Sequence, residues 1–158
     1  MTSIEEQMRA VIQRVSRASV RVEDQEVGSI GKGLLVLLGI GGSDNAADID
    51  WLAGKVSRVR LWEDADGRMN RSLEAVNGSV LVVSQFTLWG NLKKGSRPSY
   101  NRAAVPDRAK TLYEGFVRQL SEHLQKEVPT GCFGRHMEVD LVNEGPVTLI
   151  LDSAQRDF

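Results

Sequence analysis

The segment Ser84-Gln85-Phe86-Thr87 places three hydrogen-bonding side chains directly after the apolar run Val80–Val83. A hydroxyl or amide buried without a partner costs roughly 1–3 kcal/mol, so polar residues at the end of a core strand need an explanation. One explanation is a catalytic or binding site, because a rigid sheet fixes the geometry at its strand ends. The other is a strand that surfaces into a loop, with threonine chosen for its β-propensity. Taken alone, the segment favours the surfacing strand.

The rest of the chain offers few groups that could catalyse a reaction. Thr87 has no recognisable base near it in sequence, and a threonine hydroxyl without a base is a poor nucleophile. His123, His136 and the single cysteine, Cys132, have no activating neighbour at a suggestive spacing, so we interpret them as surface or filling residues. No group of possible ligands has zinc-site spacing, so we expect no metal and no cofactor. An esterase built from this sequence would depend on positioning and on main-chain N–H groups that polarise a carbonyl.

A second polar segment, Asn143-Glu144-Gly145-Pro146, lies between the apolar stretches 139–142 and 147–151. Pro146 has a restricted φ and no backbone donor, whereas Gly145 permits backbone angles that other residues resist. By itself this segment predicts a turn between two strands.

Together, the SQFT sequence at 84–87 and the NEGPVT sequence at 143–148 resemble the two signature motifs of the D-aminoacyl-tRNA deacylases. The resemblance extends from Met8 to about Leu151 and therefore covers nearly the whole chain. It includes four further stretches, MRAVIQRV at 8–15, GLLVLLG at 33–39, GSRPSY at 95–100 and PDRA at 106–109.

The resemblance implies an enzyme that hydrolyses the ester of a D-aminoacyl-tRNA, such as D-tyrosyl-tRNA, for chirality proofreading in translation. It assigns catalysis to Ser84, Gln85, Phe86 and Thr87, with backbone amides near Phe86 and Thr87 polarising the ester carbonyl. The neighbouring 2′-hydroxyl of the substrate would help to activate water. Thr87 is then a scaffold and hydrogen-bonding residue rather than a covalent nucleophile.

The same resemblance implies how the substrate is bound. A cis Gly145–Pro146 bond would aim two carbonyls at the α-ammonium and occupy the volume that an L side chain requires. Glycine has no such side chain, so glycyl-tRNA is a second expected substrate. The turn is expected to enter the site of the other subunit, which makes a homodimer a condition of activity. The substrate-binding residues are then Arg14, Phe133, Met137, Asn143, Gly145, Pro146 and Thr148.

Three of these residues have another explanation that the sequence leaves open. An arginine in an early strand, such as Arg14, fits an exposed face, although the resemblance gives it the role of holding the Gly–Pro turn. Phe133 and Met137 fit core positions as well as positions near a substrate pocket.

The rival interpretation is a non-catalytic dimeric nucleic-acid-binding module on the same fold. A large basic surface would favour it, but 20 basic and 21 acidic residues give a net charge of −1. Two local clusters exist, and a solvated loop explains each of them equally well. These clusters are Lys93, Lys94, Arg97 and Arg102, and Arg68 with Arg71.

Hydrophobic periodicity predicts the elements that position these residues. One helix is expected from Ser43 or Asp44 to about Arg60, and another from Pro106 to before Pro129. The first pair of strands is expected to be broken at Ser16-Arg17. The predicted strands are Arg9–Val15, Ala18–Val22, Val27–Ile30, Gly33–Gly39, Leu61-Trp62, Met69–Ser72, the stretch before SQFT, Phe133–Val142 and Val147–Leu151.

This order predicts one α/β domain with mixed α+β character. The resemblance implies packed sheet layers with two helices outside. The domain is expected to span residues 8–152, after a flexible extension of residues 1–7 and before a tail of residues 153–158. The chain lacks a signal-peptide pattern and any run near the roughly 18 apolar residues of a membrane helix. We therefore expect a cytoplasmic protein that binds aminoacyl-tRNA and no membrane.

Overall fold

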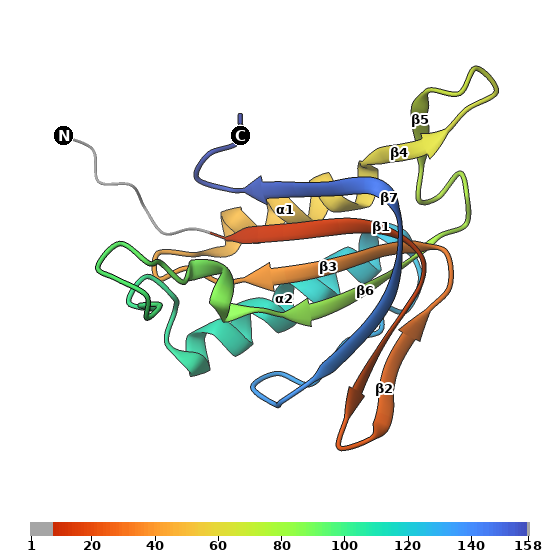
Figure 1. The fold of residues 1–158 in the computed structure, drawn as a ribbon. Helices are drawn as coiled ribbons and strands as arrows, with labels where there is room; N and C mark the ends of the chain where they lie inside the picture. Colours follow the sequence, from red (N-terminus) through yellow and green to blue (C-terminus); the bar gives the residue numbers. More distant parts are fainter. Residues whose placement is uncertain (1–7, 158) are drawn as a thin grey trace.

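The computed structural model describes residues 8–157 (Figure 1). The expected N-terminal extension, residues 1–7, lies outside the described residues. Most of the strands form one sheet in the order β2-β1-β3-β6, with β7 paired to β1 as well. Its strands are β1 (Arg9–Val22), β2 (Gln25–Ile30), β3 (Gly33–Gly39), β6 (Ser79–Ser84) and β7 (Glu138–Asp152).

Two helices and a separate β-ribbon complete the domain. The helices α1 (Ala46–Arg58) and α2 (Pro106–Leu124) both lie on one face of the sheet (Figure 1). The ribbon consists of β4 (Arg60–Glu63) and β5 (Met69–Ser72), joined by a turn that contains Asp66 and Gly67. Within residues 8–157, no helix is long and apolar enough to cross a membrane.

The main core lies between the sheet and the helices. Side chains alternate along a strand, so Leu34, Val36 and Leu38 of β3 point to the same face and are all buried. They join Leu52 of α1 and Phe116 of α2 in one cluster. This arrangement confirms the predicted α/β fold class with two helices outside the sheet.

A second core lies on the other face of the sheet, because the sheet curls over itself. The first half of β1 pairs with β3, whereas its second half pairs with β2. This change of partner brings Val15 and Val20 of β1 into one cluster with Leu35 of β3 and Leu81 of β6. The expected sheet layers are thus two parts of one curled sheet.

The prediction of two short strands at the start of the chain is wrong, since β1 is continuous. Ser16 and Arg17 interrupt the local apolar pattern, but β7 pairs with β1 on both sides of them. The hairpin partner of β1 is β2, reached through Glu23 and Asp24, whose φ angles are 51° and 64°. Positive φ at both central residues is the geometry of a tight hairpin turn.

The predicted turn at 143–146 is also wrong, because it is a bulge within the single strand β7. Val15 pairs with Asn143 and Gln13 pairs with Thr148, so residues 144–147 of β7 lie opposite Arg14 alone. We call residues 143–147 the Gly–Pro bulge. The local sequence pattern shows that the apolar run is interrupted at these residues. It does not show that β1 pairs with β7 on both sides of the interruption.

The predicted boundaries differ at two other places. Strand β7 starts at Glu138, and Phe133 lies in a turn that Gly134 closes with a φ of 75°. The N-cap of α1 is Asn45, whose side chain accepts a hydrogen bond from Ala47 N at 2.9 Å. At the other end of the described chain, Ser153 N donates to Met8 O at 2.9 Å.

Candidate active site

The SQFT segment, residues 84–87, begins at the carboxyl end of β6, where the half-buried Ser84 follows the buried stretch Val80–Val83. Ser84 pairs with Leu38 of β3, and Gln85 N donates to Leu38 O at 2.7 Å. The chain then forms the 3-10 helix η1 (Phe86–Trp89). Gly39 permits this helix to pack closely, because a Cβ there would lie 2.9 Å from Gln85 O. The segment therefore continues a rigid strand as a short helix rather than as a loop.

The first turn of η1 presents two main-chain donors at the surface. The helical bonding begins with Leu88 N, which donates to Gln85 O at 3.1 Å. The N–H groups of Phe86 and Thr87 precede that bond, as the first donors of any helix do. Within residues 8–157, neither has a hydrogen-bond acceptor. Phe86 is 59% exposed and Thr87 is also exposed, so the two residues that carry these donors lie at the surface.

Side-chain bonds then order the segment itself. The Gln85 amide nitrogen donates to the Thr87 hydroxyl oxygen. The Thr87 hydroxyl is therefore engaged by its neighbour. This geometry fits the expected scaffold role for Thr87.

Arg9 of β1 anchors η1, and the sequence contained no local signal for this role. Its Nη1 donates to Leu88 O at 3.2 Å, and its guanidinium carbon lies 4.4 Å from the centre of the Trp89 ring. Its Nη2 lies 3.0 Å from the Asp152 carboxylate at the end of β7. Arg102 stacks on the same ring at 5.4 Å. Trp89, only 2% exposed, is thus held by two arginines.

The Gly–Pro bulge is held by another arginine of β1, Arg14. Its Nε donates to Glu144 O at 2.9 Å and its Nη1 donates to Leu61 O at 2.5 Å. At 8% exposure Arg14 is buried, so the exposed-face explanation is wrong. The Gly145–Pro146 peptide bond is cis, and both residues are exposed.

Asn143 and Thr148 flank the bulge and have separate partners. Asn143 Nδ2 donates to Arg14 O at 3.0 Å and to Val147 O at 3.1 Å. Thr148 Oγ1 accepts a hydrogen bond from Gln13 Nε2 at 3.2 Å. Asn143 therefore closes the bulge on itself and also joins it to β1, and Thr148 makes a further bond to β1 just after the bulge.

The structure does not bring the SQFT segment and the Gly–Pro bulge together within one chain. Across the sheet, Ser84 is in register with Leu38, Ala10 and Leu151. The bulge lies beside Arg14, which is four residues further along β1 than Ala10. With strands about 4.8 Å apart and a rise of about 3.3 Å per residue, the two motifs are separated by roughly 20 Å. The two motifs therefore lie at different places on the sheet of one chain.

Phe133 and Met137 occupy half-buried positions at the edges of the two cores. Phe133 packs on Tyr113, with ring centres 5.6 Å apart. Met137 packs against the second cluster, and its Sδ lies so close to Gly131 that a Cβ there would approach it to 2.5 Å. These contacts fit the core explanation that the sequence left open.

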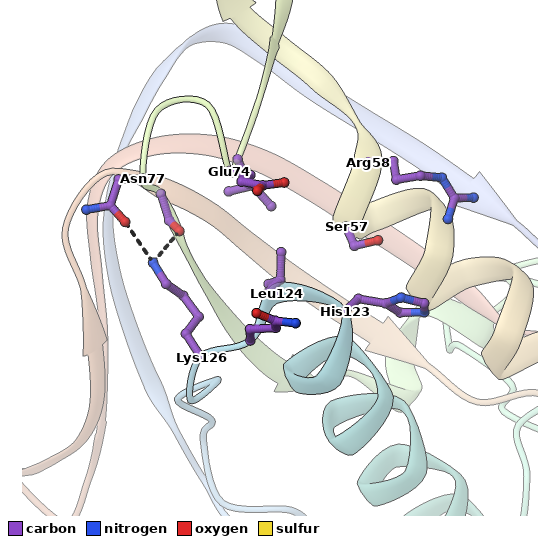
Figure 2. Close-up of a pocket in the computed structure, with 10 residues that line it drawn as sticks. Ser57, Arg58, Glu74, Asn77, His123, Leu124 and Lys126 are labelled. Carbon is purple, nitrogen blue, oxygen red and sulfur yellow. Dashed lines mark hydrogen bonds between the residues drawn. The ribbon is translucent and has the colours of Figure 1, made fainter.

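A polar cavity of about 370 Å³ lies at the other end of β6, far from the SQFT segment (Figure 2). Arg58, Glu74, His123 and Lys126 contribute its charged or titratable side chains. Figure 2 shows Lys126 bonded to the loop before β6, where its Nζ lies 2.9 Å from Gly78 O. Lys126 is therefore engaged in holding this loop. Among residues 8–157, no three His, Cys, Asp or Glu side chains form a group that could hold a metal ion.

Comparison with known proteins places the whole chain in one family. The family described as D-Tyr-tRNA(Tyr) deacylase matches residues 11–152. A D-aminoacyl-tRNA deacylase of Thermotoga petrophila is 56% identical over 148 residues, which are 94% of this chain and 99% of that protein. A D-aminoacyl-tRNA deacylase of Opitutus terrae is 55% identical over 150 residues, 95% of this chain and 100% of that protein.

A solved structure agrees with the sequence relatives. The c-Myc DNA Unwinding Element Binding Protein has a TM-score of 0.85 and 35% identity, covering 91% of this chain and 97% of its own. The match of fold and of nearly the full sequence shows that this chain belongs to the D-Tyr-tRNA(Tyr) deacylase family.

Proposed function

We propose that the protein hydrolyses the ester bond of D-aminoacyl-tRNA, such as D-tyrosyl-tRNA, and releases free tRNA and the D-amino acid. The observation that carries this proposal is the pair of accessible N–H groups at Phe86 and Thr87, held at the end of a core strand. The names of the relatives that match over the full chain support it. The proposed place of action is the cytoplasm.

The two N–H groups act as an oxyanion hole in this proposal. Water attacks the ester carbonyl carbon, and the carbonyl oxygen accepts hydrogen bonds from Phe86 N and Thr87 N as it gains negative charge. The adjacent 2′-hydroxyl of the substrate ribose assists the water, and the 3′-oxygen leaves with a proton. One such donor contributes on the order of 10²–10³ in rate, and fixed main-chain donors need no reorganisation.

The Gly–Pro bulge determines the chirality of the substrate in this proposal. The carbonyls of Gly145 and Pro146 accept hydrogen bonds from the α-ammonium group and fill the space that an L side chain would occupy. Glycyl-tRNA has no side chain to exclude and is a further proposed substrate. Selection by the main chain leaves the D side chain little constrained, so several D-amino acids are expected to be accepted.

A homodimer completes the site in this proposal, with the bulge of one subunit beside the SQFT segment of the other. The separation of roughly 20 Å within one chain supports this arrangement. The exposed apolar residues of β7 also support it, since β7 is an edge strand and such residues mark interaction surfaces. They are Val142 at 40%, Leu149 at 38% and Ile150 at 44% exposure.

The decisive experiment is the release of amino acid from charged tRNA by the purified protein. D-tyrosyl-tRNA and glycyl-tRNA are expected to be hydrolysed, and L-tyrosyl-tRNA is expected to remain intact. The rival function is a non-catalytic nucleic-acid-binding module, which is favoured by the name of the 35% identical c-Myc DNA Unwinding Element Binding Protein. Tight binding of tRNA without release of any amino acid would replace the proposed function with this rival.

A further inference from the structure

A basic pocket of about 420 Å³ lies beside η1, in the loop between η1 and α2. Four basic side chains line it, those of Lys93, Lys94, Arg97 and Arg102, and all its other lining residues are uncharged. The loop 91–102 has no acidic residue, although the whole chain has a net charge of −1. This loop therefore carries a local excess of positive charge next to the candidate active site.

Three of these cations are available to a ligand. Lys93, Lys94 and Arg97 are exposed, and none of them forms an ion pair or side-chain hydrogen bond with any of residues 8–157. Three neighbouring like charges repel one another, so the free protein gains nothing from grouping them. A bound anion would offset this repulsion.

The loop has a defined position relative to the SQFT segment. Asn91 N donates to Ser99 O at 2.9 Å, and Ser99 N donates to Asn91 O at 2.8 Å, which closes the loop at its base. The Tyr100 ring packs edge-on against the Phe86 ring, with centres 5.0 Å apart. The basic pocket and the accessible amide of Phe86 are therefore joined through two side chains in direct contact.

The chemistry of the surface matches single-stranded nucleic acid. Phe86 and Tyr100 are 59% and 39% exposed, so aromatic surface lies between the oxyanion-hole amides and the cations. Proteins that bind single strands combine a positive groove for the backbone with aromatic rings on which bases stack. A free amino acid ester has no phosphate and would not need this pocket.

We infer that Lys93, Lys94 and Arg97 bind the phosphates of the unpaired 3′ end of the tRNA, upstream of the terminal aminoacyl-adenosine. This inference rests on the proposed function and names the part of the substrate that the loop 91–102 recognises. The contacts are with phosphate and carry no sequence information, so they position the ester without selecting a tRNA.

The test compares two substrates with one variant. In Lys93→Gln/Lys94→Gln/Arg97→Gln, KM for D-tyrosyl-tRNA is expected to rise about tenfold or more, with kcat little changed. Each phosphate contact on a single strand contributes roughly 0.7 to the slope of log(kcat/KM) against log salt concentration. Loss of the three contacts should therefore make this slope shallower by about 2. Hydrolysis of D-tyrosyl-adenosine, which has no phosphate, should be unchanged.

A matched control removes the same charge elsewhere. Lys55→Gln/Lys110→Gln/Arg118→Gln takes three cations from the two helices, where glutamine keeps the helix propensity. It should leave KM for the tRNA near the wild-type value. Equal losses in the two triple variants, or an equal loss on both substrates in the loop variant, would overturn the inference.

A binding measurement separates failure of this inference from failure of the proposed function. Uncharged tRNA and the same tRNA without its three 3′-terminal nucleotides are titrated into both proteins. Removal of the nucleotides should weaken wild-type binding but not binding by the loop variant, because both changes delete the same contacts. If the wild-type protein hydrolyses neither substrate, the proposed function fails, and the binding comparison alone decides the inference. If shortening the tRNA weakens binding by the loop variant as much as binding by wild type, the two losses are additive and the inference is rejected.

Discussion

The Arg9 guanidinium lies 4.4 Å from the centre of the Trp89 ring and, through Leu88 O, connects β1 to η1. The same guanidinium pairs with Asp152 of β7 at 3.0 Å. Three elements that are distant in sequence therefore meet at one side chain, which contacts the helix η1 that carries the proposed oxyanion-hole amides.

Replacing Arg9 by glutamine should lower kcat for D-tyrosyl-tRNA about tenfold, since a small displacement of η1 misaligns its donors. KM should change less than kcat. Steady-state kinetics on the purified variant measures both. The control is Arg17→Gln, which removes an exposed ion pair with Asp140 at 3.6 Å and should leave kcat unchanged. A normal kcat in Arg9→Gln would show that η1 needs no anchor.

Replacing Arg14 by alanine should relax the preference for D- over L-substrates. The change frees Glu144 O, next to Gly145, from its 2.9 Å bond, so the bulge can shift. Loss of one charged hydrogen bond corresponds to roughly tenfold or more in selectivity. Rates with D- and L-tyrosyl-tRNA at equal enzyme concentration give the ratio. Arg14→Ala also removes the hydrogen bond to Leu61 O, which destabilises the fold. The unfolding midpoint of the variant must therefore be measured together with its rates. An equal fall on both substrates, in folded protein, would disprove this account of chirality.

Replacing Thr87 by valine should leave a residual rate, within about 10²-fold of wild type, because the main chain supplies the oxyanion donors. The comparison is the single-turnover rate with D-tyrosyl-tRNA. Cys132→Ser and prior treatment with EDTA should both leave the rate unchanged, since the proposed chemistry uses neither a thiol nor a metal. A Thr87→Val rate equal to that of the uncatalysed reaction would make the hydroxyl a catalytic group.

Replacing Ile150 by aspartate should dissociate the proposed dimer. Ile150 is 44% exposed on the edge strand β7, so a charge there is tolerated in a monomer but not in an apolar interface. Light scattering should show the monomer mass, circular dichroism an intact fold, and the deacylation assay a loss of activity. The exposed Asp140→Asn on the same strand is the control. A fully active monomer would contradict the shared site.

The stability of the protein should fall as the pH rises from about 4 to about 8, because of Asp44. Burial raises the pKa of Asp44 from 3.8 to about 8, and its Oδ2 accepts a hydrogen bond from Gly41 N at 2.7 Å. Between these values the folded state holds a proton that the unfolded state has lost, so this group lowers the unfolding free energy by about 1.4 kcal/mol per pH unit.

Asp44→Asn should remove this slope, because asparagine stays neutral and keeps an acceptor for Gly41 N. Urea unfolding at several pH values measures it. Asp64→Asn is the contrasting control, because hydrogen bonds from the backbone of Arg68 and Asp66 lower the pKa of Asp64. Its stabilising effect is present above the unfolded pKa of 3.8 and is lost as the pH falls further. An unchanged slope between pH 4 and 8 in Asp44→Asn would assign the effect to another group.

The elements whose hydrophobic pattern is local could be predicted from the order of the residues. The strands β3 and β6 and the helices α1 and α2 were predicted correctly to within a few residues, because each has its apolar pattern within its own length. The SQFT and NEGPVT motifs likewise indicated the family through residue types alone, and the comparisons confirm it.

How the two motifs are held, and where they lie, depends on contacts between distant parts of the chain. The bond between Arg14 and Glu144 spans 130 positions, and that between Arg9 and Asp152 spans 143, so no local window contains both partners. The same limit explains why β1 and β7 were predicted as broken strands. Each is continuous because the other pairs with it past its irregular residues, and that pairing is a property of the folded sheet.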